Sequence, residues 1–136
     1  MKFLDTNILV YAYDKKEKNK NKKAQDILID CWSNRSGIIS TQVLQEFYTT
    51  VTRKLAKTLS KQEAREIVKE LLAWPVYQLT PADIVVASEI EEQHNLSFWD
   101  ALIVLAAQNS GATILISEDL QDGRQIGQLK IVNPFK

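Results

Sequence analysis

Short apolar runs alternate with longer stretches of helical periodicity along the 136 residues of the chain. Strand-like runs are expected at 2–5, 37–40, 76–79, 113–117 and 129–132. Helical periodicity is expected at 7–13, 19–34, 41–57, 60–73, 81–93 and 98–110. This alternation predicts a single α/β domain over residues 1–136, built on a parallel sheet of four to five strands with helices on both faces.

The residues at the ends of several helices support these boundaries. Ser60 and Glu63 have the spacing of a capping box, in which each side chain bonds the backbone of the other. Thr41 is expected to cap the third helix, and Pro81 suits the first turn of the fifth. Gly111 suits the end of the last helix, where a left-handed backbone is common.

Charge is balanced over the whole chain, which has 17 basic and 17 acidic residues. A polyanionic partner is therefore not attracted by the overall charge, and contacts with nucleic acid must rest on local patches. One patch is the segment 15–23, with six lysines, and the other consists of Arg53, Lys54, Lys57, Lys61 and Arg65. Both patches could bind phosphates that flank a cleavage site, or could be solvated surface.

Cysteine usage and hydropathy indicate a cytoplasmic protein. The lone Cys31 lies in an apolar helical segment and cannot form an internal disulfide, so a reduced core thiol is expected. Asp5 and Asn7 interrupt the first apolar stretch, which argues against a signal peptide. No apolar run reaches the roughly 20 residues that span a bilayer, so no membrane partner is expected.

Four acidic residues occur where buried segments turn. Asp5 closes the first strand, and Asp119 follows the apolar strand near residue 115. Glu46 lies little more than one turn into the third helix, and Asp100 lies in the first turn of the uniformly apolar last helix. Ligands of an open parallel sheet bind beyond the carboxyl ends of its strands, so these four side chains are expected at one edge.

Each acid by itself also has a simpler explanation. Asp5 and Asp100 could cap helices, Glu46 could be solvated, and Asp119 could be a loop residue. These explanations do not account for the convergence of all four. Four neighbouring carboxylates repel one another, which raises the pKa of at least one of them unless a cation neutralises the charge. Oxygen ligands without a cluster of Cys or His suit Mg²⁺ or Mn²⁺.

Four segments in order carry these acids: Asp5-Thr6-Asn7, Thr41 to Glu46, Phe98 to Ile103 and Ser117 to Leu120. Together they resemble the four acidic motifs of PIN-domain ribonucleases, and especially the toxin subunits of VapBC toxin–antitoxin pairs. The resemblance covers essentially the whole chain, including the terminal Asn133-Pro134-Phe135.

The resemblance implies a metal-dependent endoribonuclease, a hydrolase that cleaves RNA phosphodiester bonds with Mg²⁺ or Mn²⁺. Asp5, Glu46, Asp100 and Asp119 would be the catalytic and metal-binding residues, with Asp5 and Asp100 the best candidates for direct ligands. A divalent ion polarises the phosphoryl oxygen and lowers the pKa of a bound water, so none of the carboxylates is expected to form a covalent intermediate.

Neighbouring residues would support this site. The resemblance implies that Thr6 and Ser117 form hydrogen bonds to the acids or to the scissile phosphate. Glu118, Asp119 and Asp122 compete for the role of the fourth acid. Asp119 is favoured because it lies in the Ser-Glu-Asp-Leu segment that resembles the family's motif, and Asp122 is next.

Four other polar or aromatic residues lie near the motifs. Trp99 beside Asp100 is expected in the core or an interface more than stacked on a base. His94, with no second histidine or cysteine nearby, is expected to end a helix, and Asn7 to help fix its turn. Arg124 has no assigned role.

Two protein partners are expected. The resemblance implies a small cognate antitoxin that inserts an Arg or Lys into the acidic site, and a homodimer is also expected. Helices 41–57 and 60–73 have enough apolar residues for a core face and a second, exposed face: Phe47, Tyr48, Val51, Leu55, Ile67, Leu71 and Trp74.

Other functions remain open at this stage. A solitary PIN-like nuclease and a non-catalytic nucleic-acid-binding module share the fold, although the second predicts loss of an acid. A haloacid-dehalogenase-like phosphatase needs an aspartate two residues after the first, where this chain has Asn7. A receiver-like phosphoacceptor needs an adjacent acidic pair before its first helix, which is missing.

Overall fold

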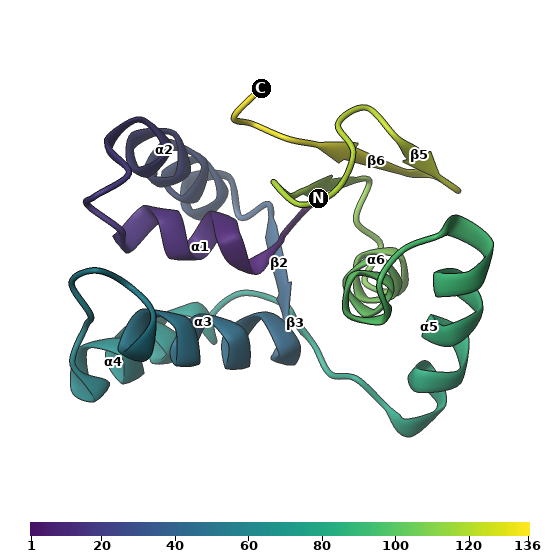
Figure 1. Ribbon diagram of the computed structural model, residues 1–136, viewed down its shortest axis with the longest axis horizontal. Helices are drawn as coiled ribbons and strands as arrows, with labels where there is room; N and C mark the ends of the chain where they lie inside the picture. Colours follow the sequence, from purple (N-terminus) through teal and green to yellow (C-terminus); the bar gives the residue numbers. More distant parts are fainter.

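Six strands and six helices form the protein, described over residues 1–136 by a computed structural model (Figure 1). The strands are β1 (Lys2–Leu4), β2 (Gly37–Ser40), β3 (Val76–Tyr77), β4 (Ile114–Ile116), β5 (Gln125–Ile126) and β6 (Leu129–Val132). The helices are α1 (Thr6–Tyr13), α2 (Lys18–Asn34), α3 (Thr41–Arg53), α4 (Lys61–Leu71), α5 (Pro81–His94) and α6 (Phe98–Asn109).

The strands form one sheet in the order β3-β2-β1-β4-β6-β5. Five strands run parallel, and β1 lies at the centre, where Phe3 pairs with Ile38 of β2 and Leu115 of β4. The expected parallel α/β sheet of four to five strands is confirmed by these five strands. β5 was not predicted, because a two-residue strand has no recognisable periodicity; it pairs antiparallel with β6 through a turn at Gly127, whose φ is +60°.

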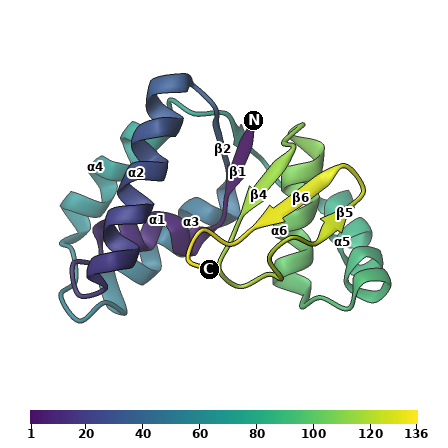
Figure 2. The same cartoon turned by 90° about the horizontal axis from the view of Figure 1, so that it is seen from above.

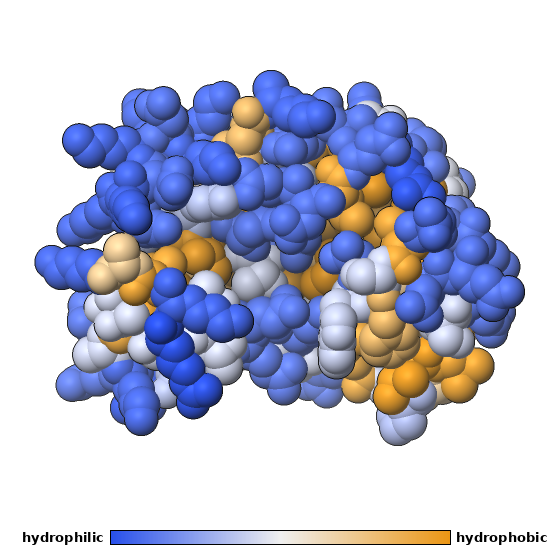
Figure 3. Space-filling view, viewed as in Figure 1, coloured by the Kyte–Doolittle hydropathy of each residue, from blue (hydrophilic) through white to orange (hydrophobic).

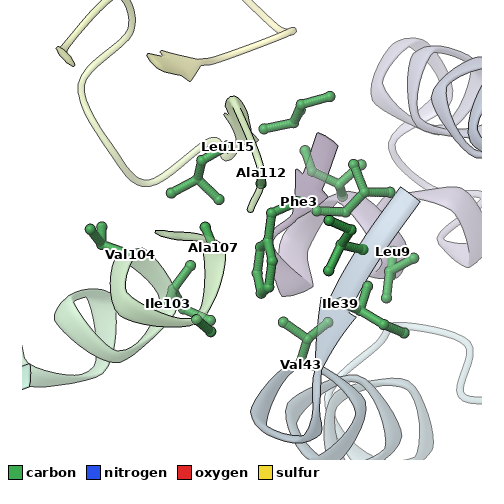
Figure 4. Close-up of a cluster of buried hydrophobic side chains, with 14 of the residues drawn as sticks. Phe3, Leu9, Ile39, Val43, Ile103, Val104, Ala107, Ala112 and Leu115 are labelled. Carbon is green, nitrogen blue, oxygen red and sulfur yellow. The ribbon is translucent and has the colours of Figure 1, made fainter. Parts of the chain in front are cut away.

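Helices cover both faces of the sheet. Figure 2 shows α1, α2 and α4 on one side and α5 and α6 on the other. Within α6 all residues from Ala101 to Ala107 are buried, which agrees with its uniformly apolar sequence. In the core, Phe3 of β1 lies between Ile103 of α6 and residues of α3 and β2 such as Val43 (Figure 4).

Helix ends depend on individual side chains. The Ser60 and Glu63 capping box is present, with hydrogen bonds of 3.0 and 3.1 Å. The expectation that Thr41 caps α3 was wrong: Ser40 is the cap, because its hydroxyl accepts from the backbone N–H of Val43 at 3.3 Å.

The apolar residues of α3 and α4 belong to the core, so the expected second exposed face is absent. Phe47, Val51, Leu71 and Trp74 are buried, and the others pack partly buried against the core: Tyr48, Leu55 and Ile67. Exposed apolar side chains instead gather on α5, at Ile84, Val85 and Val86, where Figure 3 shows a hydrophobic area at the lower right.

Two further predictions concern burial. Cys31 is a buried free thiol, as expected, and its burial raises its pKa. None of the helices combines the length and apolar character needed to cross a membrane.

Candidate active site

The carboxyl ends of β1 and β4 bring two acidic segments together. Asp5 follows β1 and caps α1, accepting from the backbone N–H of Thr6 at 2.7 Å. Its own N–H donates to the carbonyl of Ile116 at the end of β4 at 3.0 Å. The next residue, Ser117, donates its hydroxyl to the Asp5 carboxylate at 2.6 Å. The parallel pairing of β1 and β4 therefore places Asp119 at the same edge.

Helices α3 and α6 supply the other two acids. Glu46, little more than one turn into α3, accepts the hydroxyl of Thr6 at 2.6 Å. Asp100 lies in the first turn of α6, where its N–H donates to the Ser97 hydroxyl at 3.1 Å. Thr6 thus holds Glu46 towards the end of β1, a contact across 40 residues of sequence.

All four acids line one open cleft of about 380 Å³. The remaining lining residues come mainly from α1 and α3: Thr6, Asn7, Val10, Tyr11, Gln42, Thr49, Thr50, Lys54, Trp99 and Ile103. The four carboxylates therefore lie together at one edge of the sheet, as predicted.

Burial and mutual repulsion raise the pKa of two of these acids. The pKa of Asp5 rises from 3.8 to about 7, mainly because the side chain is buried, with smaller contributions from the charges of Asp119 and Glu46. Hydrogen bonds from Ser117 and Thr6 oppose this rise. The pKa of Asp100 is also raised, first by burial and then by the same two charges. A cation in the cleft would relieve this repulsion.

The donor set fits a hard divalent cation in chemistry and charge. Every acidic side chain in the cleft offers carboxylate oxygens, the ligands that Mg²⁺ and Mn²⁺ prefer. No three Asp, Glu, His or Cys side chains lie close enough to form a preassembled cage. An open arrangement suits Mg²⁺, which keeps several waters and is commonly held by one or two carboxylates together with substrate phosphate.

Asp122 and Glu118 lie outside this cleft. Asp122 accepts the backbone N–H of Asn133 at 2.8 Å and so ties the loop after β4 to the end of β6. Glu118 accepts the hydroxyl of Tyr11 and pairs with Lys20, both at 2.6 Å. Of the three candidates for the fourth acid, the structure brings only Asp119 to the cleft.

Two polar residues at the site were not given these roles from the sequence. Asn7 does more than fix a turn: its side chain donates to Asp119 at 3.0 Å and accepts the N–H of Glu118 at 3.4 Å. Gln42 is buried and donates to Glu46 at 3.5 Å and to the carbonyl of Trp99 at 3.3 Å. Its position one helical turn before Glu46 was the available signal.

Three other residues that were singled out from the sequence can be compared with the structure. Trp99 does not lie in the core: it is 63% exposed and lines the cleft beside Asp100. His94 ends α5, as expected. Arg124 donates to the carbonyl of His94 at 2.6 Å and does not line the cleft, so it binds a helix end instead of the acidic site.

Comparisons with known proteins agree with this geometry. The sequence matches the PIN domain family over residues 2–122. A search of curated proteins gave no match.

Several solved structures have a similar fold. One is a toxin–antitoxin complex from Klebsiella pneumoniae, with a TM-score of 0.70, 18% identity and 98% of both chains covered. A second is VapC20 from Mycobacterium tuberculosis, a sarcin–ricin loop cleaving toxin, with a TM-score of 0.64, 17% identity and 85% and 87% covered. A third is VapBC2 from Rickettsia felis, bound to a DNA fragment from its promoter. The TM-score is 0.65, the sequence identity is 21%, and 96% of both chains is covered.

Proposed function

Because the chain belongs to the PIN domain family, we propose that it is an endoribonuclease that hydrolyses RNA phosphodiester bonds with Mg²⁺ or Mn²⁺. The observation that carries this proposal is the convergence of Asp5, Glu46, Asp100 and Asp119 in one open cleft. A strand of RNA can enter such a cleft from solvent.

Some residues of the cleft are proposed to bind the metal ion, and others to position the metal-binding side chains. Asp5 and Asp100 are the proposed direct metal ligands, with Glu46 and Asp119 completing the acidic set. A bound divalent ion supplies polarisation of the phosphoryl oxygen and a coordinated water of lowered pKa. Ser117 keeps Asp5 in place through its hydroxyl.

Thr6 and Asn7 complete the positioning of the acids. Thr6 orients Glu46, and Asn7 orients Asp119, through side-chain hydrogen bonds that cross between elements. Such partners keep carboxylates in a productive geometry and typically change activity 10- to 100-fold when removed. Trp99, exposed at the rim, presents a flat face on which an RNA base can stack.

We also infer that the protein is the toxin of a type II toxin–antitoxin pair. Support comes from similar structures that are toxin–antitoxin assemblies and from the coverage of nearly the whole chain in these comparisons. The proposed partners are an antitoxin protein and a second copy of this chain. Exposed apolar residues on α5 supply surface for protein contacts.

Cleavage of defined RNAs tests the nuclease proposal. Purified protein is incubated with RNA and Mg²⁺ or Mn²⁺, and then with a chelator. Asp5→Asn and Asp100→Asn should each lose activity at least roughly 100-fold, since each removes one charge from the proposed metal site. Asp26→Asn, at an exposed acid of α2 paired with Lys22, is the matched control. Cleavage without metal, or full activity in both cleft variants, would overturn the proposal.

The partner proposal has a separate test. A short open reading frame for a DNA-binding protein should lie beside the gene, and its product should copurify with this chain and block cleavage. If no such neighbour exists, the protein is a solitary nuclease.

A further inference from the structure

Two basic segments that are far apart in the sequence meet beside one end of the cleft. The turn between α1 and α2 carries Lys15 and Lys16, and the turn between α3 and α4 carries Lys57. These three lysines line a second pocket of about 270 Å³, together with Tyr13, Asp14, Ala56, Thr58, Leu59 and Glu63.

The second pocket lies at the far ends of α1 and α3, the two helices that supply most of the lining of the cleft. On α1, Tyr11 lines the cleft and Tyr13 lines the second pocket, two residues further on. At the end of α3, Lys54 lines the cleft and Lys57 lines the second pocket. Tyr13, the last residue of α1, packs edge-on against Phe47 of α3, with ring centroids 5.7 Å apart.

The lysines of this surface are not neutralised by ion pairs. Lys15, Lys16, Lys54 and Lys57 form none, whereas Lys20 pairs with Glu118 at 2.6 Å. The charge of Lys57 makes only a minor contribution to the lowered pKa of Glu63, which is due mainly to hydrogen bonds from Ser60. Among the other lysines of the basic segment, Lys22 pairs with Asp26 and Lys23 donates to the carbonyl of Pro134, while Lys18 does not line the pocket. The lysines of the pocket are therefore free to bind an anion.

Two carboxylates also line the second pocket, and both accept hydrogen bonds from the backbone. Asp14 accepts the N–H of Lys16 at 3.1 Å, and Glu63 accepts the N–H of Ser60 at 3.1 Å in the capping box. Together with Lys54, the three pocket lysines leave this surface with an excess of positive charge, although the chain as a whole is neutral.

We propose that Lys15, Lys16, Lys54 and Lys57 form a track that binds the phosphates of the RNA strand on one side of the cleaved bond. This inference rests on the proposed nuclease function. A phosphate near four carboxylates is repelled, so a strand needs cations close to the cleft to remain bound. Lys54, the C-cap of α3, is eight positions beyond Glu46, roughly 12 Å at the rise of a helix, and lines the same cleft as the acids.

An RNA strand fits this surface better than a protein does. None of the large exposed apolar side chains lines this pocket, whereas the centres of protein interfaces are enriched in apolar and aromatic residues. These exposed side chains lie on α5 and at Met1, Ile29, Trp32, Leu72 and Trp99. Lysine contacts to phosphate add affinity without reading sequence. The track is therefore expected to set the register of the strand and the salt dependence of binding, and not the choice of base.

The test compares cleavage of long and short RNA by a triple variant, Lys15→Gln/Lys16→Gln/Lys57→Gln. Lys54 is kept because it lines the cleft itself. For an RNA oligonucleotide long enough to cover the track, KM should rise at least roughly tenfold at low salt, with kcat unchanged. For a dinucleotide, which does not reach the track, both constants should match the wild type. The slope of log KM against log salt should fall by about 2, at roughly 0.7 per lost phosphate contact.

A second triple variant with the same charge change is the control. Lys22→Gln/Lys69→Gln/Lys130→Gln alters exposed lysines on α2, α4 and β6. It should leave KM for the long RNA within roughly twofold of the wild type, because overall charge acts weakly compared with local contacts.

Each contrary result has a distinct meaning. If the track variant keeps the wild-type KM and salt slope, or if both triple variants lose affinity equally, the track is overturned and the nuclease proposal stands. If the track variant keeps its RNA affinity but loses an acidic protein partner, the surface belongs to that protein and the track is overturned. If the wild type cleaves no RNA, the proposed function fails and the track fails with it.

Discussion

Ser117 donates its hydroxyl to the Asp5 carboxylate at 2.6 Å, which joins the ends of β1 and β4 across 112 residues of sequence. The same hydroxyl oxygen accepts the N–H of Asp119 at 3.2 Å. Both Ser117 and Asp5 are buried. One small polar side chain therefore positions two of the four acids of the cleft.

Removing this hydroxyl should weaken both the fold and the site. Ser117→Ala leaves the buried Asp5 carboxylate with one hydrogen bond fewer, so the free energy of unfolding should fall by about 1–3 kcal/mol. RNA cleavage should fall roughly 10- to 100-fold because the carboxylate is no longer held. Ser88→Ala is the control, since its hydroxyl bonds only the Val85 carbonyl on the exposed side of α5. Unchanged unfolding and cleavage in Ser117→Ala would contradict this role.

The raised pKa of Asp5 predicts that the metal-free protein loses stability as pH rises. The pKa is about 7 in the folded protein, against an ordinary value of 3.8, so the folded state retains a proton that the unfolded state has released. Below about pH 4, Asp5 does not make the free energy of unfolding depend on pH. Between pH 4 and pH 7 it lowers that free energy progressively, by at most about 4 kcal/mol.

Denaturant unfolding at pH 5 and pH 8 in chelator measures this effect. The free energy of unfolding of the wild type should be lower at pH 8 than at pH 5. In Asp5→Asn most of this difference should be absent. At pH 8 the variant should be about 1–3 kcal/mol more stable than the wild type, because it lacks the buried charge but loses one hydrogen bond. An identical pH dependence in both proteins would exclude a strongly raised pKa at Asp5.

Divalent ions should reverse this loss at alkaline pH. Mg²⁺ or Mn²⁺ at 100 times its Kd should stabilise the folded protein by about 2.7 kcal/mol and raise its Tm. Asp5→Asn and Asp100→Asn should lose this shift, and Asp26→Asn should keep it. Thermal unfolding with and without chelator measures the shift, and an equal shift in all four proteins would place the ion elsewhere.

A side chain at Gly37 should destabilise the fold without affecting the cleft. A Cβ at this position lies 2.5 Å from the ring of Trp74, which packs edge-on against Trp32 at 5.4 Å. Gly37→Ala should cost about 1–3 kcal/mol through overpacking. The Tm should fall while cleavage below the transition stays normal, because Gly37 begins β2 at the edge opposite the cleft. Trp74→Phe in the same protein should restore part of the loss.

Much of the fold and the acidic set could be predicted from the sequence because both depend on local patterns. Alternating strand and helix periodicity determined the parallel sheet, and the positions of Asp5 and Asp119 after strands determined their shared edge. The apolar run after Asp100 indicated a buried helix, and α6 is buried. Boundaries were less certain, as Ser40 shows, because neighbouring Ser and Thr residues are equally plausible caps.

Only the tertiary structure decided which side chains meet. Asn7 reaches Asp119 across 112 residues, and Lys57 comes beside Lys15 although 42 positions separate them in the sequence. Residue type and spacing carry no information on such contacts, because they follow from the crossing of helices and the register of strands. The sequence by itself indicated the kind of chemistry and the four acids, with Asp119 favoured over Asp122. Packing decided which polar and basic side chains surround these acids, because those contacts join segments that are distant in the sequence.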